Sequence, residues 1–156
     1  MHQHTTRSAR RVLVIANETV ESTILHDAIR TCAGGEGAEI LIVAPALNSR
    51  VRHWMSDEDE ARHAAKARLA RSINRCVRDG VEATGWVGDP DPIQAIDDAL
   101  HLFPADSLII ATHPEDRSSW LARRLVLRAR RRFQLPILHI VVDAAEESEY
   151  VVLAAA

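Results

Sequence analysis

The side chains best suited to bind an anion follow two apolar runs of the sequence. One amide comes directly after the first run, and hydroxyls, an imidazole and a guanidinium follow a later run within a short stretch. Backbone N–H groups at a helix start, hydroxyls and a guanidinium together bind phosphate or carboxylate groups. A second interpretation needs no ligand, because Ser118 would also serve as an ordinary helix cap. The candidate ligand-binding residues are Asn17, Thr112, His113, Arg117, Ser118 and Ser119.

Catalysis and metal binding have weaker support in the sequence. His113 has no convincing nucleophile beside it, since Ser118 does not lie in a G-x-S-x-G turn. Asp97 and Asp98 fall in the middle of an expected helix, where a solvated face explains them better than a metal does. His139 lies inside an apolar strand and is expected to be a hydrogen-bonded core residue. We therefore predict no catalytic residue, no metal site and no enzyme, although slow nucleotide hydrolysis stays open.

The elements that must position the candidate site alternate along the chain. Continuous apolar runs predict strands covered on both faces, and one run with partly alternating polarity predicts a strand at the sheet edge. Cap residues, apolar spacing of four and stops at glycine or proline predict the helices. The expected strands are 12–16, 40–44, 81–87, 108–111 and 137–142. The expected helices begin at Thr19 or Glu18, at Ser56, at Asp91 and at Ser118 or Ser119, and end near Cys32, Asp79, Phe103 and Phe133.

This alternation predicts an α/β fold, a doubly wound five-stranded parallel sheet. The edge character of 81–87 favours the strand order 3-2-1-4-5. In that order the chain reverses direction between the first and fourth strands, and ligands of open α/β sheets bind at such a switch point. The candidate residues at Asn17 and His113 should meet there.

Composition predicts one domain in a chain of 156 residues, of which 47% are hydrophobic. We expect a flexible N-terminal tail over 1–10, the α/β domain over 11–143 and a C-terminal tail over 144–156. The tail ends in apolar residues, and three interpretations stay open: a disordered tail, a strand added to a partner's sheet, or an exposed end resembling a degradation tag. Of these, partner contact is favoured.

The charge and the hydropathy pattern predict a cytoplasmic protein that does not bind membranes. The formal net charge is −3, and no apolar run is long enough to span a bilayer. The two cysteines, Cys32 and Cys76, are not paired in a C-x-x-C motif and are expected to be reduced packing residues.

The expected fourth helix carries the densest basic run of the chain. Arginine binds phosphate well, so binding of RNA or another polyanion is an alternative function. Aromatic residues for base stacking are nearly absent nearby, and a charged outer helix face is the simpler explanation. The arginines are Arg123, Arg124, Arg128, Arg130, Arg131 and Arg132.

Taken together, several segments resemble the universal stress protein family over residues 10 to 143. The resemblance includes the first strand ending at Asn17, the Gly88-Asp89-Pro90 turn before a helix, the segment 105–113, and the final strand beginning at Leu135-Pro136. It implies a Rossmann-like fold of the adenine nucleotide alpha hydrolase type and a role in stress response or regulation. It also implies a homodimer formed through the region of the last strand.

The chain departs from the ATP-binding members of that family at two places. Asn17 stands where those members have an acidic residue beside the adenine. The loop after the fourth strand lacks their glycine-rich phosphate motif, and Pro114 has no N–H to offer while Glu115 and Asp116 repel phosphate. The sequence thus predicts a regulatory module that requires no cofactor and does not bind ATP through the family motif. Binding of ATP, AMP or another adenine nucleotide, with weak phosphotransfer or hydrolysis, is the alternative.

Overall fold

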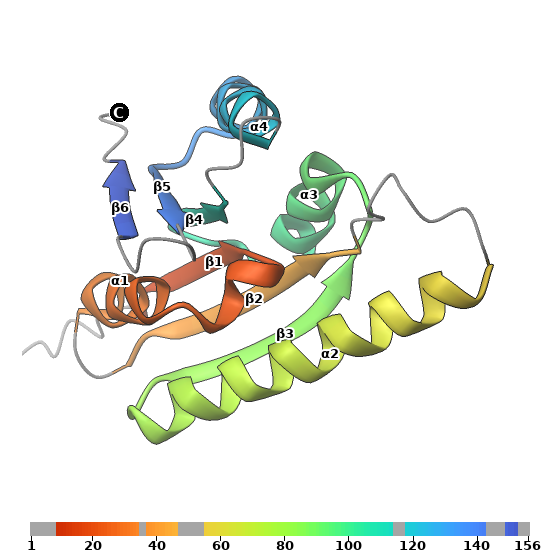
Figure 1. The fold of residues 1–156 in the computed structure, drawn as a ribbon. Coiled ribbons are helices and arrows are strands. Elements are labelled where there is room, and N and C mark those ends of the chain that lie inside the picture. The colour runs from red at the N-terminus through yellow and green to blue at the C-terminus, as the bar shows by residue number, and fades with distance from the viewer. Residues whose placement is uncertain (1–8, 35–36, 47–54, 114–117, 143–148, 153–156) are drawn as a thin grey trace, which may run out of the picture.

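The computed structural model describes residues 9–34, 37–46, 55–113, 118–142 and 149–152. Strands and helices alternate along the chain until the last strand (Figure 1). The order is β1 (Arg11–Ile15), η1 (Glu18–Glu21, a 3-10 turn), α1 (Thr23–Ala33), β2 (Glu39–Pro45), α2 (Met55–Arg78), β3 (Glu82–Gly88), α3 (Pro92–Leu102), β4 (Ser107–Thr112), α4 (Ser118–Arg132), β5 (Ile137–Val142) and β6 (Glu149–Val152).

The sheet has the order β3-β2-β1-β4-β5-β6, so the predicted order 3-2-1-4-5 is confirmed for the five parallel strands. β6 is an addition to the predicted sheet. It pairs antiparallel with β5, with Ile140 opposite Val151. Residues 149–152 fall within the segment expected to be a tail, and they form a strand on this chain's own sheet, an arrangement outside the three interpretations.

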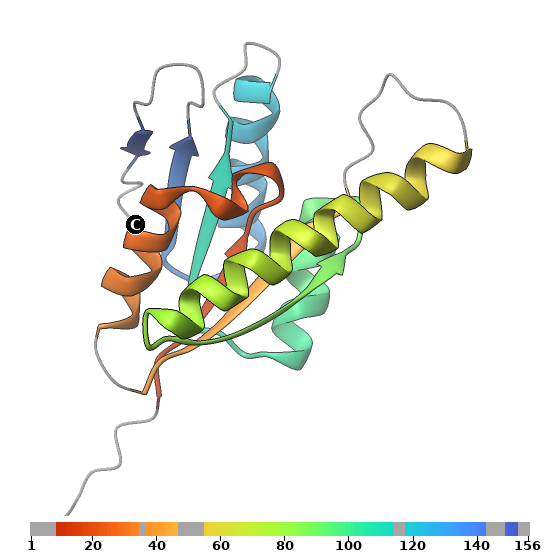
Figure 2. The same ribbon diagram turned by 60° about the horizontal axis from the view of Figure 1, so that its bottom comes forward.

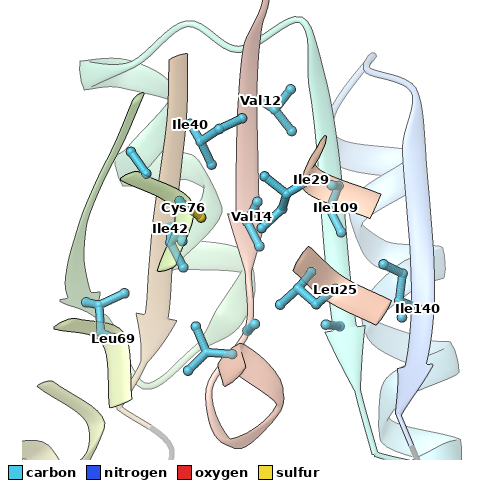
Figure 3. Close-up of a cluster of buried hydrophobic side chains, with 14 of the residues drawn as sticks. Val12, Val14, Leu25, Ile29, Ile40, Ile42, Leu69, Cys76, Ile109 and Ile140 are labelled. Carbon is cyan, nitrogen blue, oxygen red and sulfur yellow. The ribbon is translucent and has the colours of Figure 1, made fainter. Parts of the chain in front are cut away.

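The helices cover both faces of the sheet, α1 and α2 on one and α3 and α4 on the other (Figures 1 and 2). Alternate residues of β1 divide between the two cores: Val12 and Val14 face α1 and α2, whereas Leu13 and Ile15 face α3 and α4. A strand buried on both faces must be apolar at every position, which explains the unbroken hydrophobic runs. Figure 3 shows Leu25 and Ile29 of α1 over the centre of the first core.

The first helix begins later than the sequence predicted. Residues 18–21 form the 3-10 turn η1, and Ser22 caps α1 by accepting a hydrogen bond from the N–H of Leu25. The sequence predicted an apolar stripe at four-residue spacing, through Val20, Ile24, Ala28 and Cys32. Ile24, Ala28 and Cys32 are only partly buried, and the fully buried positions of α1 are Leu25, His26 and Ile29. The predicted glycine stop is present, with Gly34 in the left-handed conformation at a φ of 62°.

The edge position of β3 is confirmed, and its two glycines allow close packing. A Cβ at Gly85 would lie 2.3 Å from the carbonyl oxygen of Ile42, its partner in β2. A Cβ at Gly88 would lie 2.7 Å from Cγ1 of Val43 and 3.1 Å from Cβ of Ala95. Gly88 thus lets α3 begin close against the sheet, which is the physical role of the Gly88-Asp89-Pro90 turn.

The part of the chain that the structure describes contains no helix long and apolar enough to cross a bilayer.

Candidate switch-point site

The carboxyl ends of β1 and β4 lie side by side, because Ile15 pairs with Ile110 in the sheet. The connections from these strands leave in different directions: β1 leads to η1 and α1, and β4 leads toward α4 on the other face. This is the switch point that the strand order predicts. Asn17, Thr112 and His113 all lie at this edge, whereas Arg117 and the side chains of Ser118 and Ser119 lie outside the described part of the chain.

Asn17 is held by two hydrogen bonds that direct its side chain toward β2 and α2. Its Nδ2 donates to the carbonyl oxygen of Pro45 at 2.9 Å, and its Oδ1 accepts from Nη2 of Arg68 at 2.8 Å. An aspartate could not make the first bond, since a carboxylate has no N–H to donate. The neutral amide therefore fits this local structure, and it brings a guanidinium to the switch point.

Arg68 is a site residue that the sequence did not reveal. It lies 51 positions from Asn17, in the middle of α2, and only the tertiary structure brings the two together. Its Nε is buried and has no hydrogen-bond partner among the described residues. A buried donor without an acceptor is costly, and a bound anion is one way to satisfy it.

His113 lies on the other side of the site, between η1 and β5. Its Nδ1 lies 3.2 Å from the carbonyl oxygen of Val142, and its Nε2 lies 3.4 Å from Oε2 of Glu18. Because a carbonyl only accepts, Nδ1 carries a proton in this arrangement. Glu18 was not among the predicted site residues, although it adjoins Asn17 in the sequence.

Thr112 contributes to a separate interaction with the core. Its Oγ1 lies 2.9 Å from Nε2 of His139, which is 8% exposed. His139 is thus a hydrogen-bonded core histidine, as predicted. Burial lowers the pKa of His139, and the nearby charge of Arg130 acts in the same direction. The hydroxyl of Thr112 is therefore engaged by β5.

A third contact fixes the backbone of the site. Thr19 of η1 is buried, and its Oγ1 donates to the carbonyl oxygen of Ala111 in β4 at 3.1 Å. This bond ties the connection after β1 to the end of β4. The site is consequently built on a rigid frame of two strand ends and one 3-10 turn.

The arginines of α4 are partly paired with acids of α3. Nη2 of Arg132 lies 3.2 Å from Oδ1 of Asp97, and Nη2 of Arg128 lies 3.8 Å from Oδ2 of Asp91. Such pairing is the arrangement expected of a charged outer helix face, and it reduces the positive field available to a polyanion.

No group of acidic, histidine or cysteine side chains in the described ranges could hold a metal ion.

Comparison with known proteins supports the fold. No family model matches the sequence, and no curated protein matches it. Among solved structures, the chain is similar to a universal stress protein family protein from Arabidopsis thaliana crystallised with AMP bound. The TM-score is 0.50 at 15% sequence identity, and the match covers 90% of this chain and 99% of the other. The chain therefore has a universal-stress-like α/β fold.

Proposed function

We propose that this chain is a non-enzymatic regulatory module with a universal-stress-like fold that binds a small anionic ligand at the switch point. The observation that carries the proposal is the pair formed by Asn17 and Arg68. The pair places a guanidinium at the edge where open α/β sheets bind ligands, and it leaves the buried Nε of Arg68 without an acceptor among the described residues. A stress-response role follows from the resemblance alone.

An adenine nucleotide is the first ligand to test. The similar plant protein was crystallised with AMP, and a nucleotide carries the anionic group that Arg68 favours. Arg117, Ser118 and Ser119, the anion-binding residues predicted from the sequence, are further candidates for contacts with its phosphate groups. The loop before them differs from the glycine-rich motif, so we expect AMP to bind at least as well as ATP.

The test is thermal denaturation of the purified chain with AMP, ADP and ATP, each with and without Mg²⁺. A ligand at 100 times its dissociation constant stabilises the folded state by about 2.7 kcal/mol, which gives a clear shift of Tm. Calorimetry on Arg68→Gln and Asn17→Ala should then show at least about tenfold weaker binding, a loss of about 1.4 kcal/mol. Arg62→Gln is the matched control, because Arg62 is exposed elsewhere on α2.

The nucleotide proposal would be overturned if no nucleotide at millimolar concentration raised the Tm. Equal nucleotide affinity in Arg68→Gln and Arg62→Gln would overturn it as well. Release of phosphate from ATP in the presence of Mg²⁺ would instead support the alternative, a nucleotide-binding protein with weak hydrolysis or phosphotransfer.

We further propose that the module is a homodimer whose contact includes β6. β6 is the last strand of the sheet, and among the described residues it pairs with β5 alone. The other edge of β6 offers backbone groups to a second copy. Light scattering coupled to size-exclusion chromatography should give twice the mass of one chain. A mass that stays monomeric at about 100 μM would exclude a dimer of useful strength.

A further inference from the structure

A groove between η1, the start of α1 and the C-terminal half of α2 lies apart from the switch point. Its volume is about 610 Å³, within the range of small-molecule sites. Its lining comes from η1, α1 and α2, and the two helices cover the same face of the sheet (Figure 2). The lining contains none of Asn17, Arg68, Thr112 or His113.

The α2 wall of this groove is a row of arginines. Arg71, Arg75 and Arg78 follow one another at spacings of four and three residues, which places them along one side of the helix. Three guanidinium groups and the single carboxylate of Glu21 give the lining a formal charge of +2. Asp79 follows Arg78 in the chain but is not part of the lining.

The arginines are unequally engaged. Arg71 binds Glu21 through both carboxylate oxygens, at 2.6 Å and 3.2 Å. This bond lowers the pKa of Glu21. Arg75 makes only a long contact of 3.5 Å with the carbonyl oxygen of Glu21. In the part of the chain that the structure describes, no carboxylate lies within ion-pairing distance of Arg75 or Arg78.

The floor of the groove carries no negative charge. It includes His26 and Ser72, which are each 1% exposed and are hydrogen-bonded to each other at 3.1 Å. Ser72 also donates to the carbonyl oxygen of Val20 at 2.9 Å. An anion in the groove would therefore meet a fixed neutral floor, guanidinium groups along one wall and the amide of Asn74.

We propose that the groove lined by Arg71, Arg75 and Arg78 is a second binding site, which takes a small anion bearing phosphate or carboxylate groups. Arg75 and Arg78 each present a planar fork that binds two oxygen atoms of such a group. Arg71 keeps its bond to Glu21 and forms the side of the site. The lining charge of +2 favours a ligand with at least two negative charges.

The experiment is isothermal titration of the full chain with inorganic pyrophosphate and, separately, with citrate at low ionic strength. Binding of pyrophosphate alone assigns the site to phosphate compounds, and binding of citrate alone assigns it to carboxylates. In the double variant Arg75→Gln/Arg78→Gln, affinity should fall at least about tenfold. The control Arg62→Gln/Arg131→Gln removes the same charge from exposed positions outside the groove and should change affinity less than about twofold.

Two results would overturn the proposal: no heat from either anion at about 5 mM, or equal loss of affinity in the two double variants. Circular dichroism checks that each variant is folded. If the double variant Arg75→Gln/Arg78→Gln does not fold, the single variant Arg78→Gln, at an exposed position, replaces it. The outcome is independent of the switch-point proposal. Arg68→Gln should leave pyrophosphate binding at the groove intact, and Arg75→Gln/Arg78→Gln should leave AMP binding intact.

Discussion

At the scale of single residues, a chain of buried hydrogen bonds joins α1 to α2. The carbonyl oxygen of Val20 only accepts, so the hydroxyl of Ser72 donates to it and accepts from Nε2 of His26. Nδ1 of His26 then accepts from the thiol of Cys76, whose sulfur lies 3.7 Å away. Burial, and secondly the charge of Arg75, lowers the pKa of His26, whereas burial raises the pKa of Cys76 to about 11. Both shifts favour the neutral form of the side chain at neutral pH, and Cys76 packs in the first core.

Ser72→Ala should destabilise the protein by about 1–3 kcal/mol, because it removes the buried hydroxyl that hydrogen-bonds both His26 and the carbonyl of Val20. Urea denaturation measures the change. Asn74→Ala on the exposed side of the same helix is the control and should change the free energy of unfolding by less than about 0.5 kcal/mol. Equal effects of the two substitutions would contradict the assigned hydrogen bonds.

Gly85→Ala should destabilise the edge strand by at least about 1–3 kcal/mol. The new Cβ would lie 2.3 Å from a backbone oxygen of β2, so no side-chain rotation relieves the clash. Thr84→Ala, at an exposed neighbouring position, should cost less than about 1 kcal/mol. Thermal denaturation compares the two, and a Gly85→Ala protein as stable as Thr84→Ala would show that β3 shifts freely.

At the scale of elements, α3 is held at its N-terminus by a cap and by the neighbouring helix. Asp91 accepts a hydrogen bond from the N–H of Ile93 at 3.0 Å, and Pro92 follows it at the first helical position. The same carboxylate faces Arg128 of α4 at 3.8 Å. Both side chains of this ion pair are about half exposed, so the pair contributes little in water. The cap is thus the larger contribution.

Asp91→Ala should cost about 1 kcal/mol, whereas Asp91→Asn should cost much less, since asparagine keeps the cap and loses only the charge. Chemical denaturation of both variants separates the two contributions. If Asp91→Asn were as unstable as Asp91→Ala, the ion pair with Arg128 would be the more important interaction.

At the scale of the whole molecule, the two cores on opposite faces of the sheet each contain one buried histidine. His26 lies under α2, and His139 lies in β5 beside Thr112. The pKa of each is lowered from an ordinary value of 6.5, mainly by burial. The unfolded chain therefore binds more protons than the folded chain once the pH falls below about 6.5.

The stability conferred by these neutral histidines is complete above pH 6.5 and is lost as the pH falls from there toward their lower folded values. Each contributes a slope of at most about 1.4 kcal/mol per pH unit. Urea midpoints measured between pH 8 and pH 5 should decrease, and His139→Gln should flatten the decrease. An unchanged profile in His139→Gln would mean that His139 gains its proton as readily in the folded state as in the unfolded state.

The sequence by itself determined the parallel sheet and its order. A strand covered by helices on both faces has to be apolar at every position, and β1, β2, β4 and β5 carry that pattern, while the partly alternating β3 falls at the edge. The glycine stop at Gly34 and the cap at Asp91 are equally local, because each depends on neighbours within a few residues. The same holds for the place of the switch point, which follows from strand order alone.

Only the tertiary structure decided what surrounds the candidate sites. Arg68 hydrogen-bonds Asn17, 51 positions away, and Arg71 hydrogen-bonds Glu21, 50 positions away. The helical spacing of α2 does not predict either partner. The late start of α1 and the pairing of β6 with β5 were also missed. The 3-10 turn depends on the hydrogen bond from Thr19 to Ala111, 92 positions away. β6 pairs with the strand just before it, and four residues after an acidic segment carry too little pattern to predict a strand.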